Sequence, residues 1–314
     1  MNTFWIILSV VVGIALLSVV FYFSLNLIFY NISLSKNSMM KSYIEKRMKK
    51  NFHLYKVDYM WFEKKRVEHF KIRRDKLTLH ANFYERKDDN KLAIICHGYA
   101  ADYREMSMYA KYFYNRGFSI LLPEFRAHGK SEGKTIGMGW PDRLDLKKWI
   151  EFMVDKNPNY EIVLFGLSMG ASTVCMAVGE DLPENVKCAI SDCAYDNVYD
   201  QFEFVSSRMK MVNSKFIMKV YNNFLKRAFE IDLVQFDAIR QVKKAKIPML
   251  FIHGDADEFV PYDNLQRLYN AHPLEKHKYI YTCKGAGHAL SYAKDEDEYE
   301  KQINQFLKKE YYHE

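Results

Sequence analysis

Charged side chains are absent from the first 35 residues, which sets the N-terminal segment apart from the rest of the 314-residue chain. From Phe4 to Tyr30 the segment is almost continuously apolar, longer than the about 20 residues that cross a bilayer as a helix. The alternatives are a buried core helix and a cleaved signal peptide, which has a basic start, an apolar stretch of about 7–15 residues and a small-residue cleavage site. Because no Lys or Arg precedes the segment and bulky side chains end it, we expect residues 1–35 to be an uncleaved transmembrane anchor.

Cysteine is also scarce, with five scattered residues in the whole chain. No CxxC pair occurs, and no cluster of His and Cys has the spacing of a zinc site, so we expect no metal. Cys96, Cys175 and Cys188 lie inside apolar runs, where cysteine acts as a small buried hydrophobic residue. Reduced thiols agree with a cytoplasmic location of the protein.

The net charge of +7 is unevenly distributed. From Lys36 to Lys76 there are 14 Lys or Arg and 5 Asp or Glu, an excess of nine positive charges that leaves the remaining chain slightly acidic. This pattern argues against a nucleic-acid partner, because nucleic-acid-binding domains typically have a basic stripe on the folded domain itself. We interpret residues 36–65 as a basic juxtamembrane connector. By the positive-inside rule it predicts that the C-terminal domain lies in the cytoplasm. We expect five of its basic residues near anionic headgroups: Lys41, Lys46, Arg47, Lys49 and Lys50.

Residues 66–314 have the pattern of one α/β domain. Arg66–Ile72 and Leu77–Tyr84 alternate around a polar turn, which predicts a hairpin. Beyond it, short apolar runs alternate with helical stretches, as in a mostly parallel sheet with helices on both faces. The expected strands are Leu92–Cys96, Phe118–Leu122, Ile162–Phe165, Val186–Ile190, Met249–Ile252 and Tyr279–Tyr281. The expected helices are Arg104–Asn115, Arg143–Val154, Met169–Val178, Asn264–Asn270 and Glu296–Lys309.

One stretch, residues 196–244, separates two expected strands by more than the usual short crossover. It is rich in Phe, Met, Tyr and Lys, and its apolar residues recur with helical spacing. We interpret it as a small helical cap over an active site, with a longer crossover helix as the alternative.

The strongest local motif is Gly166-x-Ser168-x-Gly170, which directly follows an apolar strand and opens a helix-forming run. A nucleophile on so tight a strand-to-helix turn needs small neighbours, and its hydroxyl is held exposed at the N-terminus of the helix. The positive end of that helix favours a developing oxyanion. We therefore expect Ser168 to be a catalytic nucleophile.

A nucleophilic serine needs a base and an orienting carboxylate, and both follow in the chain order of this fold. His288 lies between Gly287 and Ala289 after the last expected strand, with room for its ring to reach Ser168. Asp257 lies on the loop after the preceding strand and is our candidate for the acid. Its rivals are Asp192, which ranks second, and the neighbours Asp255 and Glu258.

The oxyanion hole is expected to combine the backbone N–H of Met169 with that of Tyr99, on the loop after the strand Leu92–Cys96. Gly98 lets this loop approach closely. We expect His97 to hydrogen-bond within its own loop, without a catalytic role. In the segment Arg126–Gly133, we expect polar side chains to fix the loop rather than to bind substrate.

Five motifs in order resemble the α/β-hydrolase superfamily: His97-Gly98, Arg126–Gly133, Gly166–Gly170, His253–Pro261 and Gly287-His288. The resemblance covers about Arg66 to Lys309, and within the superfamily the chain looks like the bacterial membrane-anchored, lysophospholipase-like serine hydrolases. Two positions depart from the family pattern. Ala127 stands where many relatives have Gly, and Tyr99 replaces the second Gly of the HGG-type lipase loop.

Together, these residues predict a serine hydrolase that cleaves a carboxylic ester, a small molecule or a lipid, through an acyl-enzyme. The mechanism requires no metal or organic cofactor. The same triad serves thioesterases, peptidases and acyltransferases, which stay as alternatives within enzymes. A membrane-tethered binding module is a further alternative, although a pure binder has no need of a strained serine.

Overall fold

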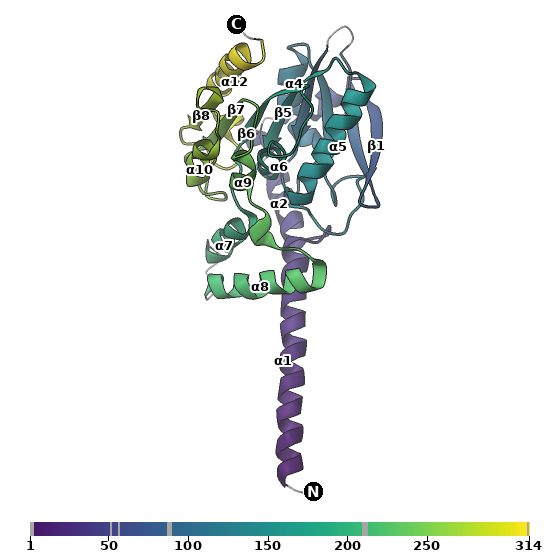
Figure 1. Cartoon of the computed structure of the whole chain (residues 1–314), viewed down its shortest axis with the longest axis vertical. Helices are drawn as coiled ribbons and strands as arrows, with labels where there is room; N and C mark the ends of the chain where they lie inside the picture. The colour runs from purple at the N-terminus through teal and green to yellow at the C-terminus, as the bar shows by residue number, and fades with distance from the viewer. Residues whose placement is uncertain (1–2, 51, 56, 87–89, 209–212, 313) are drawn as a thin grey trace.

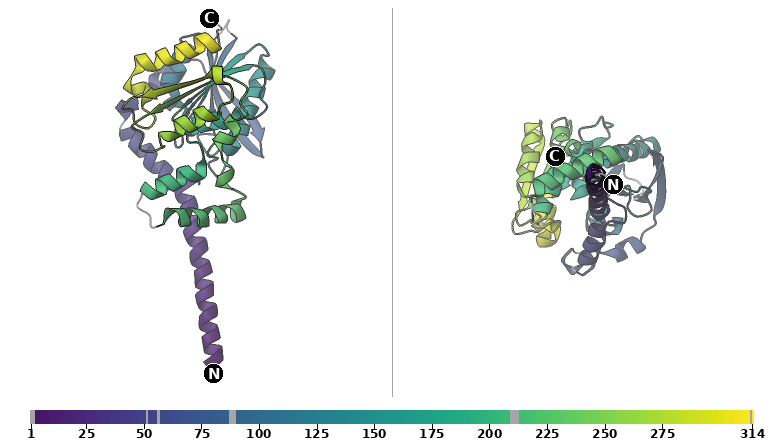
Figure 2. Two further views of the ribbon diagram at one scale, coloured as in Figure 1. Left: turned by 60° about the vertical axis from the view of Figure 1, so that its left-hand side comes forward. Right: turned by 90° about the horizontal axis from the view of Figure 1, so that it is seen from below.

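The computed structural model describes residues 3–50, 52–55, 57–86, 90–208, 213–312 and 314. Two parts stand out in Figure 1: a long, straight helix at the N-terminus and a layered domain that holds the rest of the chain. The sheet is at the centre of that domain, with helices on both faces (Figure 2).

The described sheet has eight strands in the order β1-β2-β4-β3-β5-β6-β7-β8. Strand β2 is antiparallel to β1 and to β4, and the remaining pairs are parallel, which confirms the predicted mostly parallel sheet. At the predicted hairpin, Asp75 and Lys76 both have positive φ, as a two-residue turn between twisted strands requires. The strands are β1 Glu68–Arg74, β2 Leu77–Tyr84, β3 Lys91–Cys96, β4 Ser119–Glu124, β5 Glu161–Leu167, β6 Val186–Asp192, β7 Met249–Gly254 and β8 Lys278–Cys283.

The apolar runs of the central strands are continuous because both faces of the sheet are covered. On β3, Leu92 and Ile94 belong to one hydrophobic cluster, whereas Ala93 and Ile95 belong to the other. The first cluster includes helices α5 (Trp140–Lys156), α6 (Met169–Ala177) and α10 (Asp263–Ala271). The second includes α4 (Ser107–Tyr114) and α12 (Glu296–Glu310), with the short helix α11 (Ser291–Lys294) beside α12.

All five expected helices are present, with shifted ends. Helix α4 is shorter than expected, since Tyr103–Met106 forms a 3-10 turn before it. Helix α5 begins three residues early, at Trp140, because the Asp142 side chain accepts the backbone N–H of Gly139 at the helix N-terminus. Such side-chain capping is not visible in apolar periodicity.

The long insertion between β6 and β7 is mostly helical. It contains α7 (Val198–Arg208), α8 (Ser214–Phe229), the 3-10 turn Leu233–Gln235 and α9 (Ala238–Val242). Helix α9 packs on α6 and α10, close to the sheet, whereas α7 and α8 pack on each other. Both lie beside the end of the N-terminal helix in Figure 1.

The N-terminal helix α1 spans Thr3–Ser33 and is long and apolar enough to cross a membrane. Its last turns are part of the folded domain, because Tyr30 stacks on Phe229 with ring centroids 4.3 Å apart. The turn after α1 is also bound to the domain. Ser35 forms a β-bridge with Thr135, and the Ile136 N–H donates to the Leu34 carbonyl oxygen at 2.7 Å.

The basic connector contains α2 (Met39–Lys50), the 3-10 turn Phe52–Tyr55 and α3 (Tyr59–Glu63), which the sequence analysis did not anticipate. Figures 1 and 2 show α2 running back along the layered domain, away from the free part of α1, which is the N-terminal part that projects from the domain. Lys41 donates to the Ala127 carbonyl oxygen at 3.3 Å, and Lys46 is exposed. The side chains expected at headgroups from Arg47, Lys49 and Lys50 lie outside the described residues.

Candidate active site

Ser168 occupies the tight turn between β5 and α6, with φ 56° and ψ −117°. This is a strained conformation for a residue with a side chain. The glycines on either side permit it. A Cβ at Gly166 would lie 2.3 Å from the Gly170 carbonyl oxygen, and a Cβ at Gly170 would lie 2.1 Å from the Cys96 carbonyl oxygen. The motif therefore forms the tight strand-to-helix turn that its sequence context predicts.

The structure brings the predicted serine, histidine and aspartate into one hydrogen-bonded chain. Ser168 Oγ lies 2.8 Å from His288 Nε2, and His288 Nδ1 lies 2.7 Å from Asp257 Oδ2. Since an ionised carboxylate only accepts, Nδ1 carries the proton and Nε2 accepts from the serine hydroxyl. In this arrangement the imidazole can remove the serine proton while the carboxylate holds its orientation.

Asp257 is held from several sides. Its Oδ1 accepts the backbone N–H groups of Phe259 and Val260 at 2.8 and 2.9 Å. Burial alone would raise the pKa of Asp257, but His288 and His253 outweigh it and hold that pKa well below the usual range. The Asp257 carboxylate is therefore ionised at neutral pH.

The rival acids are engaged elsewhere. Asp192 is fully buried, and it accepts the hydroxyl groups of Tyr299 at 2.9 Å and Ser291 at 3.4 Å. Burial raises the pKa of Asp192 to about 6. Asp255 accepts the Gly285 N–H at 2.5 Å, and both Asp255 and Glu258 are exposed. Of these carboxylates, Asp257 is the one hydrogen-bonded to His288.

His253 is a residue of this site that the sequence analysis left without a role. Its Nε2 lies 3.1 Å from the same Asp257 Oδ2 that binds His288, and it is almost fully buried. The sequence does show a histidine near the end of a buried strand, four residues before the acid. The direction of its side chain, however, is known only from the structure.

The loop after β3 lies against the elbow. A Cβ added at Gly98 would be 3.5 Å from the Cβ of Ser168, so the predicted donor Tyr99 follows immediately beside the serine. The other predicted donor, Met169, is the first residue of α6, where a backbone N–H has no acceptor within its helix. The two predicted oxyanion donors therefore belong to segments that adjoin Ser168.

Two buried histidines secure this loop, as expected of His97. Its Nδ1–H donates to the Gly98 carbonyl oxygen at 2.8 Å, and its Nε2 accepts the Phe125 N–H at 3.1 Å. His128 Nε2 accepts the Ala100 N–H at 3.3 Å. Burial lowers the pKa of His97 to about 4 and that of His128 well below its usual value, so both rings are neutral.

Comparisons with known proteins agree with this fold. Residues 87–230 match the family described as serine aminopeptidase, S33. The chain is similar to the Bacillus subtilis protein YqkD, with 27% identity over 70% of this chain and 72% of that protein. It is also similar to a Bacillus subtilis carboxylesterase, with 22% identity over 71% of this chain and 94% of the other. Among solved structures, the Pyrococcus furiosus esterase Pf2001 superposes with a TM-score of 0.64 at 21% identity, covering 78% of this chain and 91% of that one.

This chain is a member of the α/β-hydrolase superfamily. The eight-stranded sheet, the elbow after β5 and the two loops after β7 and β8 are the parts of that fold that position the site.

In this α/β hydrolase the loop after β3 is tied to the end of α1. The Tyr99 hydroxyl donates to the Ser33 carbonyl oxygen at 2.7 Å and lies 2.6 Å from Ser38 Oγ. Ser33 Oγ in turn lies 3.0 Å from the Tyr221 hydroxyl on α8. The last turn of the apolar helix therefore joins the loop beside Ser168 to the insertion helix.

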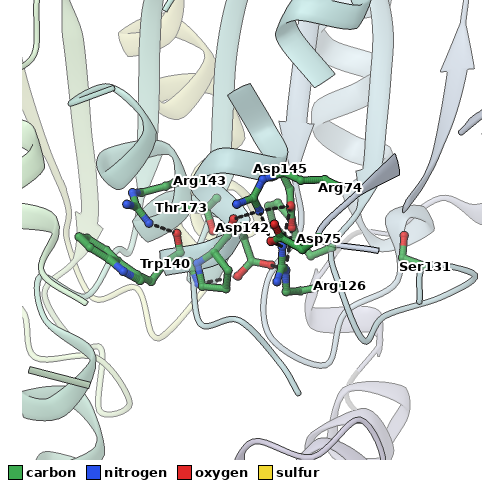
Figure 3. Close-up of polar contacts among 12 residues, drawn as sticks. Arg74, Asp75, Arg126, Ser131, Trp140, Asp142, Arg143, Asp145 and Thr173 are labelled. Atoms are coloured by element: carbon green, nitrogen blue, oxygen red, sulfur yellow. Dashed lines mark hydrogen bonds and ion pairs between the residues drawn. The ribbon is translucent and has the colours of Figure 1, made fainter. Parts of the chain in front are cut away.

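The segment after β4 has the structural role that we expected. Arg126 binds both carboxylate oxygens of Asp145 at 2.7 and 2.8 Å, and Arg74 binds the same carboxylate at 2.7 Å (Figure 3). Asp142 lies beside this cluster, and burial, followed by the charge of Asp145, raises its pKa to about 7. The network links the β1–β2 hairpin to the start of α5.

Three possible metal-ligand atoms lie within 4.8 Å of one another, on Cys193, Asp257 and His288. Two of them are already in the hydrogen-bonded chain to Ser168. Burial raises the pKa of the Cys193 thiol well above its usual value, which disfavours the thiolate that a metal needs. The chemistry of this set fits a hydrogen-bonded triad better than a metal site.

Proposed function

We propose that the chain is a membrane-anchored serine hydrolase that cleaves carboxylic esters. The observation that carries the proposal is the chain of hydrogen bonds from Ser168 through His288 to Asp257, with the serine held on a strained elbow. A strained serine paired with an oriented base has a use in nucleophilic catalysis and none in binding alone, which argues against a tethered binding module.

In the proposed mechanism, Ser168 Oγ attacks the carbonyl carbon of the ester while His288 Nε2 takes its proton. The backbone N–H groups of Tyr99 and Met169 stabilise the oxyanion of the tetrahedral intermediate. His288 then gives the proton to the leaving alcohol, and the acyl group stays on Ser168. A water molecule, deprotonated by His288, attacks this acyl-enzyme. His288 then returns the proton to Ser168 Oγ as the acid is released. Asp257 stays ionised and stabilises the imidazolium in both half-reactions.

We propose that α1 anchors the domain in a membrane, with residues 1–35 as anchor, 36–65 as connector and 66–314 as catalytic domain. Residues 196–244 are the proposed cap, since α7 and α8 lie apart from the sheet near the end of α1. A cytoplasmic domain is supported by the basic flank of the anchor and by five buried, unpaired cysteines.

Amphiphilic esters, including lysophospholipid-like lipids, are the proposed substrate class. The anchor supports this proposal because it places the site beside a lipid surface. Peptide hydrolysis is the second candidate, because the matching family is described as serine aminopeptidase. Amide cleavage requires the same triad and differs in the leaving group that His288 protonates.

The acid can be tested by exchanging each candidate carboxylate for its amide. Asp257→Asn in the full-length chain should lower ester turnover by about 10⁴, because the imidazole loses the partner that fixes its tautomer. Asp192→Asn is the matched control, and it should lower turnover by less than about tenfold, since Asp192 bonds to Tyr299 and Ser291 instead. Turnover of a p-nitrophenyl ester is the measurement, with circular dichroism to check folding. A severe loss at Asp192 and a mild one at Asp257 would move the acid to Asp192.

The support of the oxyanion loop by α1 can be tested at Tyr99. Tyr99→Phe keeps the ring and removes the hydroxyl that binds Ser33 and Ser38, so kcat should fall on the order of 10-fold while KM changes little. Tyr221→Phe removes the other bond to Ser33 without touching the loop and should leave kcat within about twofold. Equal effects of both variants on kcat, or a change in KM alone, would contradict a positioning role of Tyr99.

The substrate class can be tested with one panel on the full-length chain in detergent. The panel contains p-nitrophenyl esters of increasing acyl length, a lysophospholipid, an acyl thioester and an aminoacyl anilide. We expect the esters to be cleaved with the highest kcat/KM and Ser168→Ala to abolish every activity. Preferred cleavage of the anilide would replace the esterase proposal with an aminopeptidase.

A further inference from the structure

The free part of α1 is one bilayer core in length. Residues 4–21 are exposed apart from the intermediate Gly13. Among the described residues, Tyr22 is the first whose ring packs on an aromatic ring outside α1. At 1.5 Å per residue, these residues span about 27 Å, close to the about 30 Å of a hydrocarbon core. If α1 spans the membrane, the level of Tyr22 is the level of the lipid headgroups.

Helix α8 crosses α1 at this level. Phe224 packs edge-on against Tyr22 and Phe23, with ring centroids 6.2 and 6.0 Å apart. Figures 1 and 2 show α8 lying across α1, nearly at a right angle to it, between the domain and the free part of α1. A helix perpendicular to a membrane-spanning helix lies in the plane of the membrane surface.

The two faces of α8 differ in character. The inner face is buried and mostly apolar, formed by Met218, Tyr221, Asn222, Phe224 and Leu225. The opposite face is exposed and basic, formed by Lys215, Phe216, Lys219, Asn223, Lys226 and Arg227. Phe216 is 62% exposed, which is unusual for a large apolar side chain in this domain. Lys226 binds Asp232 at 2.9 Å, whereas no ion pair is found for Lys215, Lys219 or Arg227 within the described residues.

We propose that α8 is an interfacial helix whose exposed face binds the anionic headgroup layer of the membrane. Basic residues with an aromatic side chain on one face are typical of helices that lie on anionic lipid surfaces, and each Lys or Arg near such a surface adds to the attraction. The proposal rests on the proposed anchoring by α1. It assigns the headgroup contact to α8, because α2 leads away from the free part of α1 and its Lys41 is engaged with Ala127.

Two consequences follow for the site. The loop beside Ser168 and helix α8 both contact the end of α1. Tyr99 of the loop binds Ser33 there. Tyr221 of α8 binds the same serine. A headgroup layer that holds α8 therefore holds the proposed cap at a fixed height between the bilayer and the strand ends, where an amphiphilic substrate arrives.

The experiment uses the full-length chain reconstituted in vesicles and an environment-sensitive fluorophore on a single introduced cysteine. The five native cysteines are buried, so an exposed cysteine can be labelled selectively. Asn223→Cys places the label in the middle of the exposed face of α8, and Gln305→Cys on α12 is the control at the far end of the domain. The vesicles contain phosphatidylcholine with or without about 30% phosphatidylglycerol. Quenching by a headgroup-linked quencher is compared with quenching by iodide.

We expect the label at position 223 to be quenched mainly by the lipid-linked quencher in the anionic vesicles, and the label at position 305 mainly by iodide. Lys215→Glu with Lys219→Glu should weaken the contact by at least about 30-fold, since each lost lysine accounts for about fivefold. Iodide quenching at position 223 should then rise toward that at position 305. Lys301→Glu with Lys308→Glu on α12 reverses the same charge far from the membrane and should change nothing.

The outcomes separate this proposal from the anchor itself. A chain that fails to float with the vesicles would overturn anchoring by α1. A chain that floats but shows equal iodide quenching at positions 223 and 305 would overturn the interfacial role of α8 and leave the anchor intact. Lipid quenching at position 223 that is unchanged by the two Lys→Glu substitutions, or equal in neutral vesicles, would overturn recognition of anionic headgroups.

Discussion

The close approach of α6 to the end of β3 is the constraint on which the site depends. The Gly170 backbone packs so near the Cys96 carbonyl oxygen that no side chain fits between them. This contact lets the chain turn from β5 into α6 within one residue and holds Ser168 at positive φ. The serine is therefore fixed by packed backbone on both sides. Its position in turn sets where His288 and Asp257 must lie to form the hydrogen-bonded chain.

The hydrogen bonds around Ser168 come from segments that are distant from it in the sequence. His288 and Asp257 reach Ser168 from the loops after the last two strands, and His253 adds a bond to the same carboxylate. A separate pair of hydrogen bonds, made by the Tyr99 hydroxyl, ties the loop beside Ser168 to the end of α1. The proposed membrane anchor is thus in direct contact with the loop that we expect to bind the oxyanion, and the anchor and the site form one packed unit.

Local sequence patterns predicted the sheet and the order of the site residues well, because buried parallel strands and the elbow motif have strong short-range signals. The two glycines around Ser168 and the small residues beside His288 fall in this class. Side-chain direction could not be predicted. His253 is part of a recognised motif, but its bond to Asp257 depends on how β7 is buried. The packing of the end of α1 against the domain could not be predicted either, because the contact of Tyr30 with Phe229 joins residues far apart in the sequence. For the same reason, basic residues counted in the connector gave no indication of the basic face of α8.

Covalent labelling of Ser168 tests the central claim most directly. The full-length chain in detergent is treated with a fluorophosphonate probe, and the modified residue is located by peptide mass spectrometry, with Ser172→Ala as a neighbouring control. Ser172 donates to the Tyr195 carbonyl oxygen, and within the described part of the chain no hydrogen bond joins it to a histidine. We expect modification at Ser168 alone, lost in Ser168→Ala and kept in Ser172→Ala. No modification of the folded chain, or equal labelling of the Ser168→Ala variant, would contradict it.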